Sequence, residues 1–214
     1  MTRNVQVSVA QSRKAFFVRC CHRYFEMVNN TADSGNRYSA DEFARFLSSN
    51  DGRFELIDGQ IYMLASPTVL HQRICGFIYR QTADYLDGKK CEAFIAPLDV
   101  FLSDEDGYCE NVYQPDVMVV CDEDKIGNRG INGSPDLVIE VSSPSSYRVD
   151  HMNKLINYGR FGVREYWIVD PTKGRIFVYS LGAADSFDLA IFTMRDTVAV
   201  GIFDGALSID FSAV

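Results

Sequence analysis

The chain has 214 residues, of which 47% are hydrophobic and 23% are charged, so we expect one folded globular domain rather than a disordered chain. No apolar run approaches the ~18–20 residues that a membrane span requires, and we expect no membrane partner. The net charge of −8 excludes a protein that coats nucleic acid through a broad basic surface, but it does not exclude a nuclease with a cation-binding acidic centre.

The N-terminal stretch differs from the rest, and we predict an extension over residues 1–37 outside a domain over residues 38–214. Residues 1–26 hold five basic residues against one acid, and their longest apolar run is too short for the core of a secretory signal. The stretch fits a poorly ordered tail or an extension upstream of a true start at Met27, and we prefer the second. A mitochondrial-type targeting peptide is a third, less favoured interpretation.

Two local signals predict the first elements of the domain. Ser39 with Glu42 three residues later is a capping-box pattern, which predicts the start of a helix. The pair Asp58-Gly59 lies between two apolar arms and predicts a two-residue turn in a β-hairpin over residues 54–63.

A long helix and three strands follow. Thr68 is a candidate N-cap for a helix over residues 69–86, whose apolar residues recur at helical spacing. Pro97 indicates an edge or a bulge in the first strand. The three predicted strands cover residues 92–102, 113–120 and 136–142.

The C-terminal third alternates between helix and strand signals. A helix is predicted over residues 149–161, ending at Gly162, and a strand hairpin over residues 165–169 and 175–181, with further strands to residue 211. The central order of helix, three strands, helix and strand predicts an α/β sandwich with a mixed β-sheet flanked by helices.

Two acidic residues lie on strands of this predicted core. Glu140 interrupts the apolar run of residues 137–141, and a carboxylate buried there is costly unless it is paired or binds a metal. Asp116 opens the preceding strand. Two adjacent carboxylates repel, so their joint ionisation requires a cation or a raised pKa for one of them; oxygen-only ligands suit Mg²⁺ or Mn²⁺. The alternatives are that Asp116 caps the strand entrance and that Glu140 forms a buried ion pair with Lys154.

The following helix carries Asp150, Lys154 and Tyr158 at successive four-residue spacings, so they share one face. Directed at the carboxylates, Lys154 could orient the attacking water or stabilise charge on a phosphoryl group. The alternatives are a surface salt bridge between Lys154 and Asp150, and a helix-capping role for Asp150.

Two further residues are supporting candidates. Glu55 on the hairpin could be a third acid, although a solvent-facing strand residue explains it as simply. His71 at the start of the long helix is expected to be structural or to contact a phosphate. Seven basic residues are candidates for a DNA-facing rim: Arg73, Arg80, Lys89, Lys90, Arg148, Arg160 and Arg164.

Six cysteines are present: Cys20, Cys21, Cys75, Cys91, Cys109 and Cys121. They form no CxxC pair, and no histidine lies at zinc-finger spacing. We therefore expect reduced thiols and a cytoplasmic location.

An ordered set of motifs resembles the Uma-two family of the PD-(D/E)xK, restriction endonuclease-like superfamily. The stretches are FELIDGQI (54–61), SPTVLH (66–71), QPDVMVV (114–120), PDLVIEVSSPSS (135–146), the spaced Asp150, Lys154 and Tyr158, and GVREYWIVDP (162–171). The resemblance spans about residues 38–211. It implies a restriction endonuclease-like α/β fold with an αβββαβ core, preceded by an N-terminal helix and a β-hairpin.

By this resemblance, Asp116 is the first acid of the superfamily signature and Glu140 the second. Ser142 stands where the signature lysine is expected, and Lys154 matches a lysine that has migrated to the helix. Glu55 matches an acid that lines the same site.

The leading hypothesis is a Mg²⁺-dependent endonuclease acting on DNA, in which Asp116 and Glu140 hold the metal, Glu55 assists and Lys154 positions water. The alternative is a nuclease fold with little or no cleavage that acts as a nucleic-acid-binding or dimerisation module. A homodimer is expected by analogy only, because double-strand cleavage needs two sites.

Overall fold

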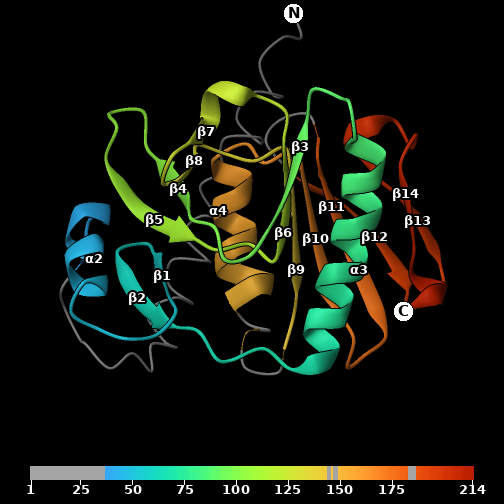
Figure 1. Ribbon diagram of the computed structural model, residues 1–214, viewed down its shortest axis with the longest axis horizontal. Helices are drawn as coiled ribbons and strands as arrows, with labels where there is room; N and C mark the ends of the chain where they lie inside the picture. The colour runs from blue at the N-terminus through green and yellow to red at the C-terminus, as the bar shows by residue number, and fades with distance from the viewer. Residues whose placement is uncertain (1–36, 144–145, 147–148, 183–186) are drawn as a thin grey trace, which may run out of the picture. The chain divides into compact units, whose positions relative to one another are not determined.

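The computed structural model describes residues 37–143, 146, 149–182 and 187–214. All of these lie in one compact unit, Arg37–Val214 (Figure 1). The predictions about the basic N-terminal stretch, including Met27 as the start, lie outside the described residues and stay predictions.

The first elements follow the local signals of the sequence. Helix α2 (Ala40–Leu47) begins with the predicted capping box, in which Ser39 and Glu42 exchange side chain–backbone hydrogen bonds. Strands β1 (Phe54–Ile57) and β2 (Gln60–Met63) form the predicted hairpin. Its two turn residues have φ values of 49° and 75°, the left-handed conformation that an Asp-Gly turn supplies.

Helix α3 (Val69–Leu86) has the predicted bounds, and the Thr68 hydroxyl accepts a hydrogen bond from the backbone N–H of His71. Ile74 and Ile78 on its apolar side are fully buried. The helix therefore packs its apolar stripe on the core, as the periodicity indicated.

One six-stranded sheet has the order β2-β1-β5-β4-β8-β7. All its pairs are antiparallel except β4 with β8. The strands not yet placed are β4 (Val100–Ser103), β5 (Cys109–Tyr113), β7 (Ile126–Gly127) and β8 (Gly130–Asn132). A 3₁₀ turn (Glu123–Lys125) precedes β7.

The second six-stranded sheet has the order β12-β11-β10-β9-β6-β3 and is the predicted mixed sheet. Strands β9 and β10 are parallel and the other pairs are antiparallel. Its strands are β3 (Glu92–Ile95), β6 (Val117–Val120), β9 (Leu137–Val141), β10 (Glu165–Asp170), β11 (Arg175–Leu181) and β12 (Phe187–Thr193). A small third sheet pairs β13 (Thr197–Ala199) with β14 (Ser208–Asp210).

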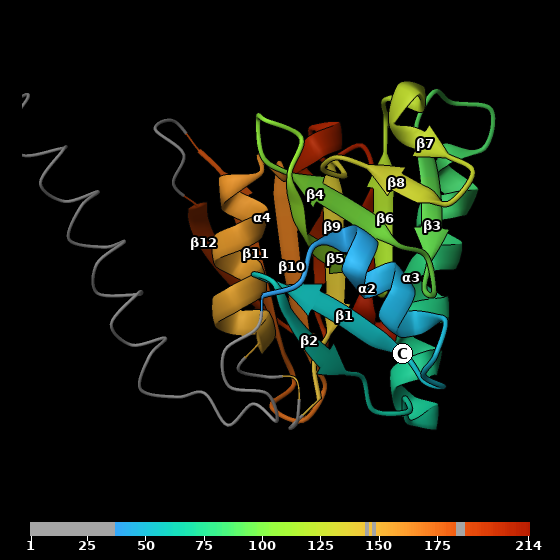
Figure 2. The ribbon, with the colours of Figure 1, turned by 90° about the vertical axis from the view of Figure 1, so that its left-hand side faces the viewer.

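The second sheet is covered on both faces. Leu137, Ile139 and Val141 of β9 pack in the same cluster as Ile74 of α3. Val138, on the opposite face, belongs to a cluster with residues of the first sheet and of α4 (Leu155–Arg160). Figures 1 and 2 show α3 on one side of this sheet, and α4 with the first sheet on the other. Glu140 therefore points into the layer between the sheet and α4.

Three predicted elements needed correction. The strand expected over residues 92–102 is two strands in different sheets, β3 and β4, and the strand expected over residues 113–120 is β5 and β6. Each break contains a proline, Pro97 or Pro115, which lacks the N–H that a continuous ladder requires. The helix predicted from Val149 begins with a π-helical segment (Val149–Lys154) and becomes α-helical only in α4.

The expectation of reduced thiols is wrong for Cys91 and Cys121, which form a disulfide. Antiparallel β3 and β6 pair Glu92 with Val120, so the residues just outside this pair lie opposite each other, with Cα atoms 3.9 Å apart. The two cysteines are 30 positions apart in the sequence, and only strand register brings them together. Cys75 and Cys109 are free; Cys20 and Cys21 lie outside the described residues.

We predict that replacing both Cys91 and Cys121 with alanine lowers the free energy of unfolding by about 2–4 kcal/mol, because the bridge restricts a loop of this length in the unfolded chain. Urea unfolding with and without reductant measures the effect, and Cys109→Ala is the matched control. Identical unfolding curves for oxidised and reduced wild type would contradict the bridge.

Within the described residues, no helix has both the length and the apolar character needed to cross a membrane.

Candidate active site

Lys154 lies at the centre of a buried acidic cluster. Its Nζ donates hydrogen bonds to Oε1 of Glu140 at 2.8 Å and to Oε1 of Glu55 at 3.0 Å. Asp150 Oδ1 lies 3.9 Å from the same Nζ, and the Tyr158 hydroxyl donates to Glu140 Oε1 at 3.3 Å. The side chains of Lys154 and these three acids are at most 6% exposed. The site therefore draws on the hairpin, a central strand and the helix after it.

Hydrogen bonds from the surrounding elements fix this helix in place. The Tyr166 hydroxyl on β10 donates to the backbone carbonyl of Asp150 at 3.1 Å, which supports the π-helical turn. Asn157 Nδ2, one turn beyond Lys154, donates to Asp58 Oδ1 at 3.0 Å in the hairpin turn. The backbone N–H of Gln114 donates to Glu55 Oε1 at 2.8 Å. Each partner of Lys154 is therefore itself held by backbone or by a buried side chain.

The cluster holds three carboxyl groups, of Glu55, Glu140 and Asp150, and one ammonium group, that of Lys154. Burial raises the pKa of Glu140 well above its usual range, although Lys154 opposes the shift. Burial alone would lower the pKa of Lys154, but Glu140, Glu55 and Asp150 outweigh it and raise that pKa. Lys154 is therefore an ammonium group at neutral pH, suited to stabilise negative charge and not to remove a proton.

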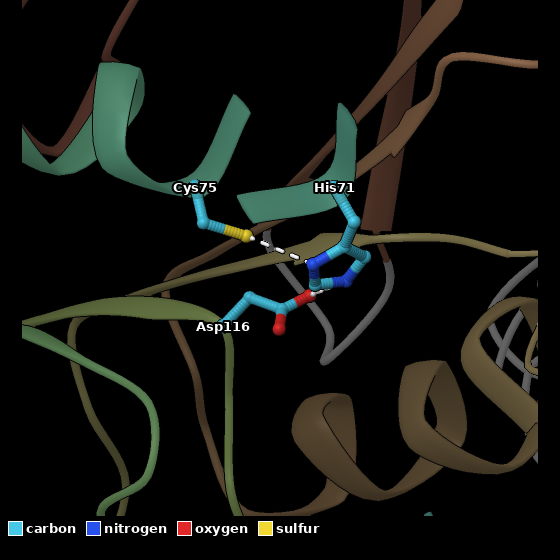
Figure 3. Close-up of side chains that lie close together, drawn as sticks. All are labelled: His71, Cys75 and Asp116. Atoms are coloured by element: carbon cyan, nitrogen blue, oxygen red, sulfur yellow. Dashed lines mark hydrogen bonds and ion pairs between the residues drawn. The ribbon is translucent and has the colours of Figure 1, made fainter. Parts of the chain in front are cut away.

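Asp116 lies just before β6, beside the residues that follow Glu140 on β9. Its Oδ2 accepts a hydrogen bond from the backbone N–H of Val141 at 2.8 Å and lies 3.2 Å from Nε2 of His71. The hydrogen bond with Asp116 raises the pKa of His71 above its ordinary value. On the other side of the ring, His71 Nδ1 lies 3.4 Å from Cys75 Sγ (Figure 3).

The donor set fits a hard divalent cation. Among the described residues, the hydrogen bonds of Asp116 use Oδ2 and those of Glu140 use Oε1, which leaves one oxygen of each carboxylate for another ligand. Carboxylate oxygens are the ligands that Mg²⁺ and Mn²⁺ prefer. The excess of carboxylates over ammonium groups also favours a bound cation, because buried like charges raise one another's pKa.

The burial of the Asp150 carboxylate gives a prediction about stability. Burial raises the pKa of Asp150 to about 6 from 3.8, against the effect of Lys154. The folded protein thus binds this proton more tightly than the unfolded chain does, and the stability contributed by the protonated form is lost as the pH rises from about 4 through 6. We predict that Asp150→Asn raises the free energy of unfolding of the metal-free protein by about 1–3 kcal/mol at pH 7.5.

Urea unfolding between pH 4 and pH 8 in the presence of a chelator checks the Asp150→Asn prediction, and the gain should vanish at the acidic end. Asp188→Asn, at an exposed position of β12, is the matched control. A variant that is less stable than wild type at pH 7.5 would show that Asp150 stabilises the cluster instead.

Comparisons with known proteins agree with this fold. The family described as "Putative restriction endonuclease", Uma2, matches residues 40–210. The chain belongs to the Uma2 family. An uncharacterized protein of Synechocystis sp. is 28% identical over 145 residues, which cover 67% of this chain and 74% of that protein.

A similar fold is seen in the crystal structure of a "putative nuclease belonging to DUF820" from Anabaena variabilis. That structure superposes on this chain with a TM-score of 0.64 and 20% sequence identity, over 81% of this chain and 94% of that one. At this identity the likeness confirms the predicted restriction endonuclease-like fold and nothing finer. The family assignment supports a nuclease.

In this Uma2 chain the structure brings together four of the predicted residues around Lys154: Glu55, Glu140, Asp150 and Tyr158. The predicted metal ligand Asp116 and the supporting candidate His71 contact each other beside them, a contact that the sequence did not predict. Two alternatives from the sequence are wrong. Glu55 is 1% exposed and does not face solvent, and the Lys154–Asp150 pair is buried and not on the surface. The alternative of an ion pair between Glu140 and Lys154 is observed.

Sequence reasoning missed two supporting residues. Cys75 lies four residues after His71 on α3, so helical spacing alone could have suggested a contact. Gln114 offered no such signal, because it contacts Glu55 across 59 positions of sequence.

Several basic residues that were predicted to form a DNA-facing rim have partners within the protein. Arg160 pairs with Asp104, and Arg164 Nη1 lies 3.2 Å from Asp136 Oδ1. Lys89 lies against Tyr85, and Arg80 against the ring of Phe77. Arg148 lies outside the described residues.

Proposed function

We propose that the chain is a Mg²⁺- or Mn²⁺-dependent endonuclease that hydrolyses phosphodiester bonds in DNA. The observation that carries the proposal is the buried contact of Lys154 with Glu140 beside Asp116, with one oxygen of each acid unbonded among the residues that the structure describes. Membership of a family described as restriction endonucleases supports the reaction class.

In this proposal Asp116 and Glu140 hold the cation. The bound ion would activate water and neutralise charge on the phosphoryl group. Lys154, fixed beside Glu140, would orient the attacking water and stabilise the negative charge that develops on the phosphate oxygens. The Tyr158 hydroxyl keeps Oε1 of Glu140 directed toward Lys154.

The contacts suggest narrower roles for the other candidates. Glu55 accepts from both Lys154 and the backbone of Gln114, so we assign it to positioning the ammonium group. Asp150 sets the charge balance around Lys154 from 3.9 Å. His71 holds Oδ2 of Asp116. We keep all three as supporting residues of the reaction.

The decisive experiment is a cleavage assay on supercoiled plasmid, single-stranded DNA, branched DNA and RNA, with Mg²⁺, Mn²⁺ or a chelator. We expect DNA cleavage that requires the divalent ion and is lost with the chelator and in Lys154→Ala. Cleavage that persists with the chelator would contradict the metal assignment, and cleavage of RNA alone would contradict the substrate.

A second candidate function is a nucleic-acid-binding or dimerisation module without cleavage. The observation that favours it is that the ammonium group of Lys154 pairs with both Glu140 and Glu55, so these carboxylates have a cationic partner within the protein itself. Calorimetric titration with Mn²⁺ distinguishes the two functions. Binding that Asp116→Asn abolishes favours the endonuclease, and no binding at millimolar Mn²⁺ favours the module.

We also propose a homodimer, because cleavage of both strands of a duplex requires two sites. Light scattering during gel filtration should give twice the mass of the chain. A mass of one chain, both for the free protein and for its complex with DNA, would contradict the homodimer. We keep a cytoplasmic location as part of the proposal, because the enzyme would meet a DNA substrate there. The Cys91–Cys121 disulfide would persist there only if protected from reduction, and both residues are partly buried.

A further inference from the structure

Cys75, His71 and Asp116 form a chain of two contacts beside the acidic cluster. His71 and Cys75 lie one turn apart on α3, and Asp116 reaches the ring from the start of β6 (Figure 3). Each ring nitrogen has its own partner: Nε2 lies 3.2 Å from Asp116 Oδ2, and Nδ1 lies 3.4 Å from Cys75 Sγ.

The chemistry of the two partners decides where the ring proton lies. An ionised carboxylate only accepts hydrogen bonds, so Asp116 favours a proton on the ring nitrogen that faces it. In the neutral ring Nδ1 is then an acceptor, and the thiol of Cys75 is the donor that faces it. Burial, with the nearby charges of Asp116 and Glu140, raises the pKa of Cys75 above its usual range, so the thiol keeps its proton.

Two other interpretations fit the contacts less well. The ligand atoms of these three residues lie within 4.8 Å of one another, a spacing that a metal ion could bridge. However, a single ion binds one ring nitrogen, and here the two nitrogens face different partners. A nucleophilic role for Cys75 is excluded because its residue is 2% exposed, which denies access to a substrate.

We propose that Cys75 is a positioning residue whose thiol holds His71 as the Nε2–H tautomer, so that His71 and the Val141 N–H together occupy Oδ2 of Asp116 and leave Oδ1 for a divalent cation. The statement about the cation rests on the proposed function, whereas the statement about the tautomer does not. Partners of this kind tune metal sites by fixing the orientation of their ligands.

The test is the tautomer of His71, read from imidazole ¹⁵N shifts in protein labelled at histidine, at a pH above the one at which the same shifts show the ring losing its charge. The signal is assigned by its loss in His71→Gln. We expect the Nε2–H form in wild type and in Cys75→Ser, which keeps a donor. Cys75→Val keeps a side chain of similar size but no donor, and should give a mixture of tautomers. Cys109→Val controls for loss of the other free thiol.

Mn²⁺ affinity provides a second readout that does not require turnover. We expect Cys75→Val to bind Mn²⁺ about 3–10-fold more weakly than wild type and Cys75→Ser to restore the affinity. If the tautomers are as expected but wild type does not bind Mn²⁺, the cation-binding role of Asp116 Oδ1 and the proposed function are both overturned. The assignment of the His71 tautomer is then retained.

The positioning role of Cys75 is overturned by an Nδ1–H form in wild type or by an unchanged tautomer in Cys75→Val. Stoichiometric Zn²⁺ binding that requires Cys75 and His71 but survives Glu140→Gln would overturn it in favour of a metal site. Thermal unfolding of each variant, measured in parallel, confirms that the comparisons are made on folded protein.

Discussion

Replacing Lys154 with methionine is expected to lower the free energy of unfolding of the metal-free protein by about 3–5 kcal/mol at pH 7.5. The substitution leaves Glu55, Glu140 and Asp150 buried together without their cation, and removing one partner of a buried ion pair has a cost of this size. Methionine preserves much of the length and apolar volume of the lysine stem, so the loss reports mainly on charge.

The pH dependence identifies the cause of the Lys154→Met loss. Without Lys154 the carboxyl pKa values rise further, and a buried carboxyl group becomes tolerable once it is protonated. The deficit relative to wild type should therefore shrink as the pH falls toward 4. Urea unfolding with a chelator measures it, and Lys90→Met, at an exposed position, is the control. A deficit that stays constant from pH 4 to pH 8 would point to lost packing instead.

Divalent ions should partly restore the stability of Lys154→Met, because a cation bound by Asp116 and Glu140 compensates the same negative charge. Cleavage, in contrast, should remain lost, since the ammonium group beside Glu140 is missing. A variant that cleaves DNA as fast as wild type would remove Lys154 from the proposed mechanism.

Replacing Glu140 with glutamine is expected to reduce divalent-ion-dependent cleavage by more than about 100-fold, because even outer partners of metal ligands cost about 10–100-fold when they are changed. The amide keeps the shape of the side chain and an oxygen that can accept from Lys154. Lys154 also retains Glu55 at 3.0 Å, so the fold should persist. Plasmid nicking rates and Mn²⁺ titration measure the two losses together.

Glu92→Gln is the matched control for Glu140→Gln, because Glu92 is an exposed strand residue and the substitution changes the charge equally. Circular dichroism establishes that both variants are folded. Normal cleavage by Glu140→Gln would reject the assignment of Glu140 as a metal ligand. If Glu140→Gln binds Mn²⁺ normally but no longer cleaves DNA, Glu140 is not a metal ligand and its role is to position Lys154.

The sequence by itself determined those features whose causes are local. Ser39 with Glu42 fixed the start of α2, and Asp58-Gly59 fixed the first hairpin, because caps and two-residue turns depend on neighbouring residues. The apolar run around Glu140 correctly placed that acid on a buried strand, because a strand that is covered on both faces is apolar at nearly every position. The ordered motifs supplied the fold class.

The tertiary structure decided which side chains meet. Lys154 contacts Glu55 across 99 positions of sequence, and no local pattern shows that this hairpin acid is buried rather than exposed. Strand register, set by pairing across the sheet, joined Cys91 to Cys121. The packing of α3 on β9 set Cys75 and His71 against Asp116. Such contacts depend on how whole elements pack. That packing is the one that removes apolar surface from water over the entire core, and no short stretch of sequence encodes it.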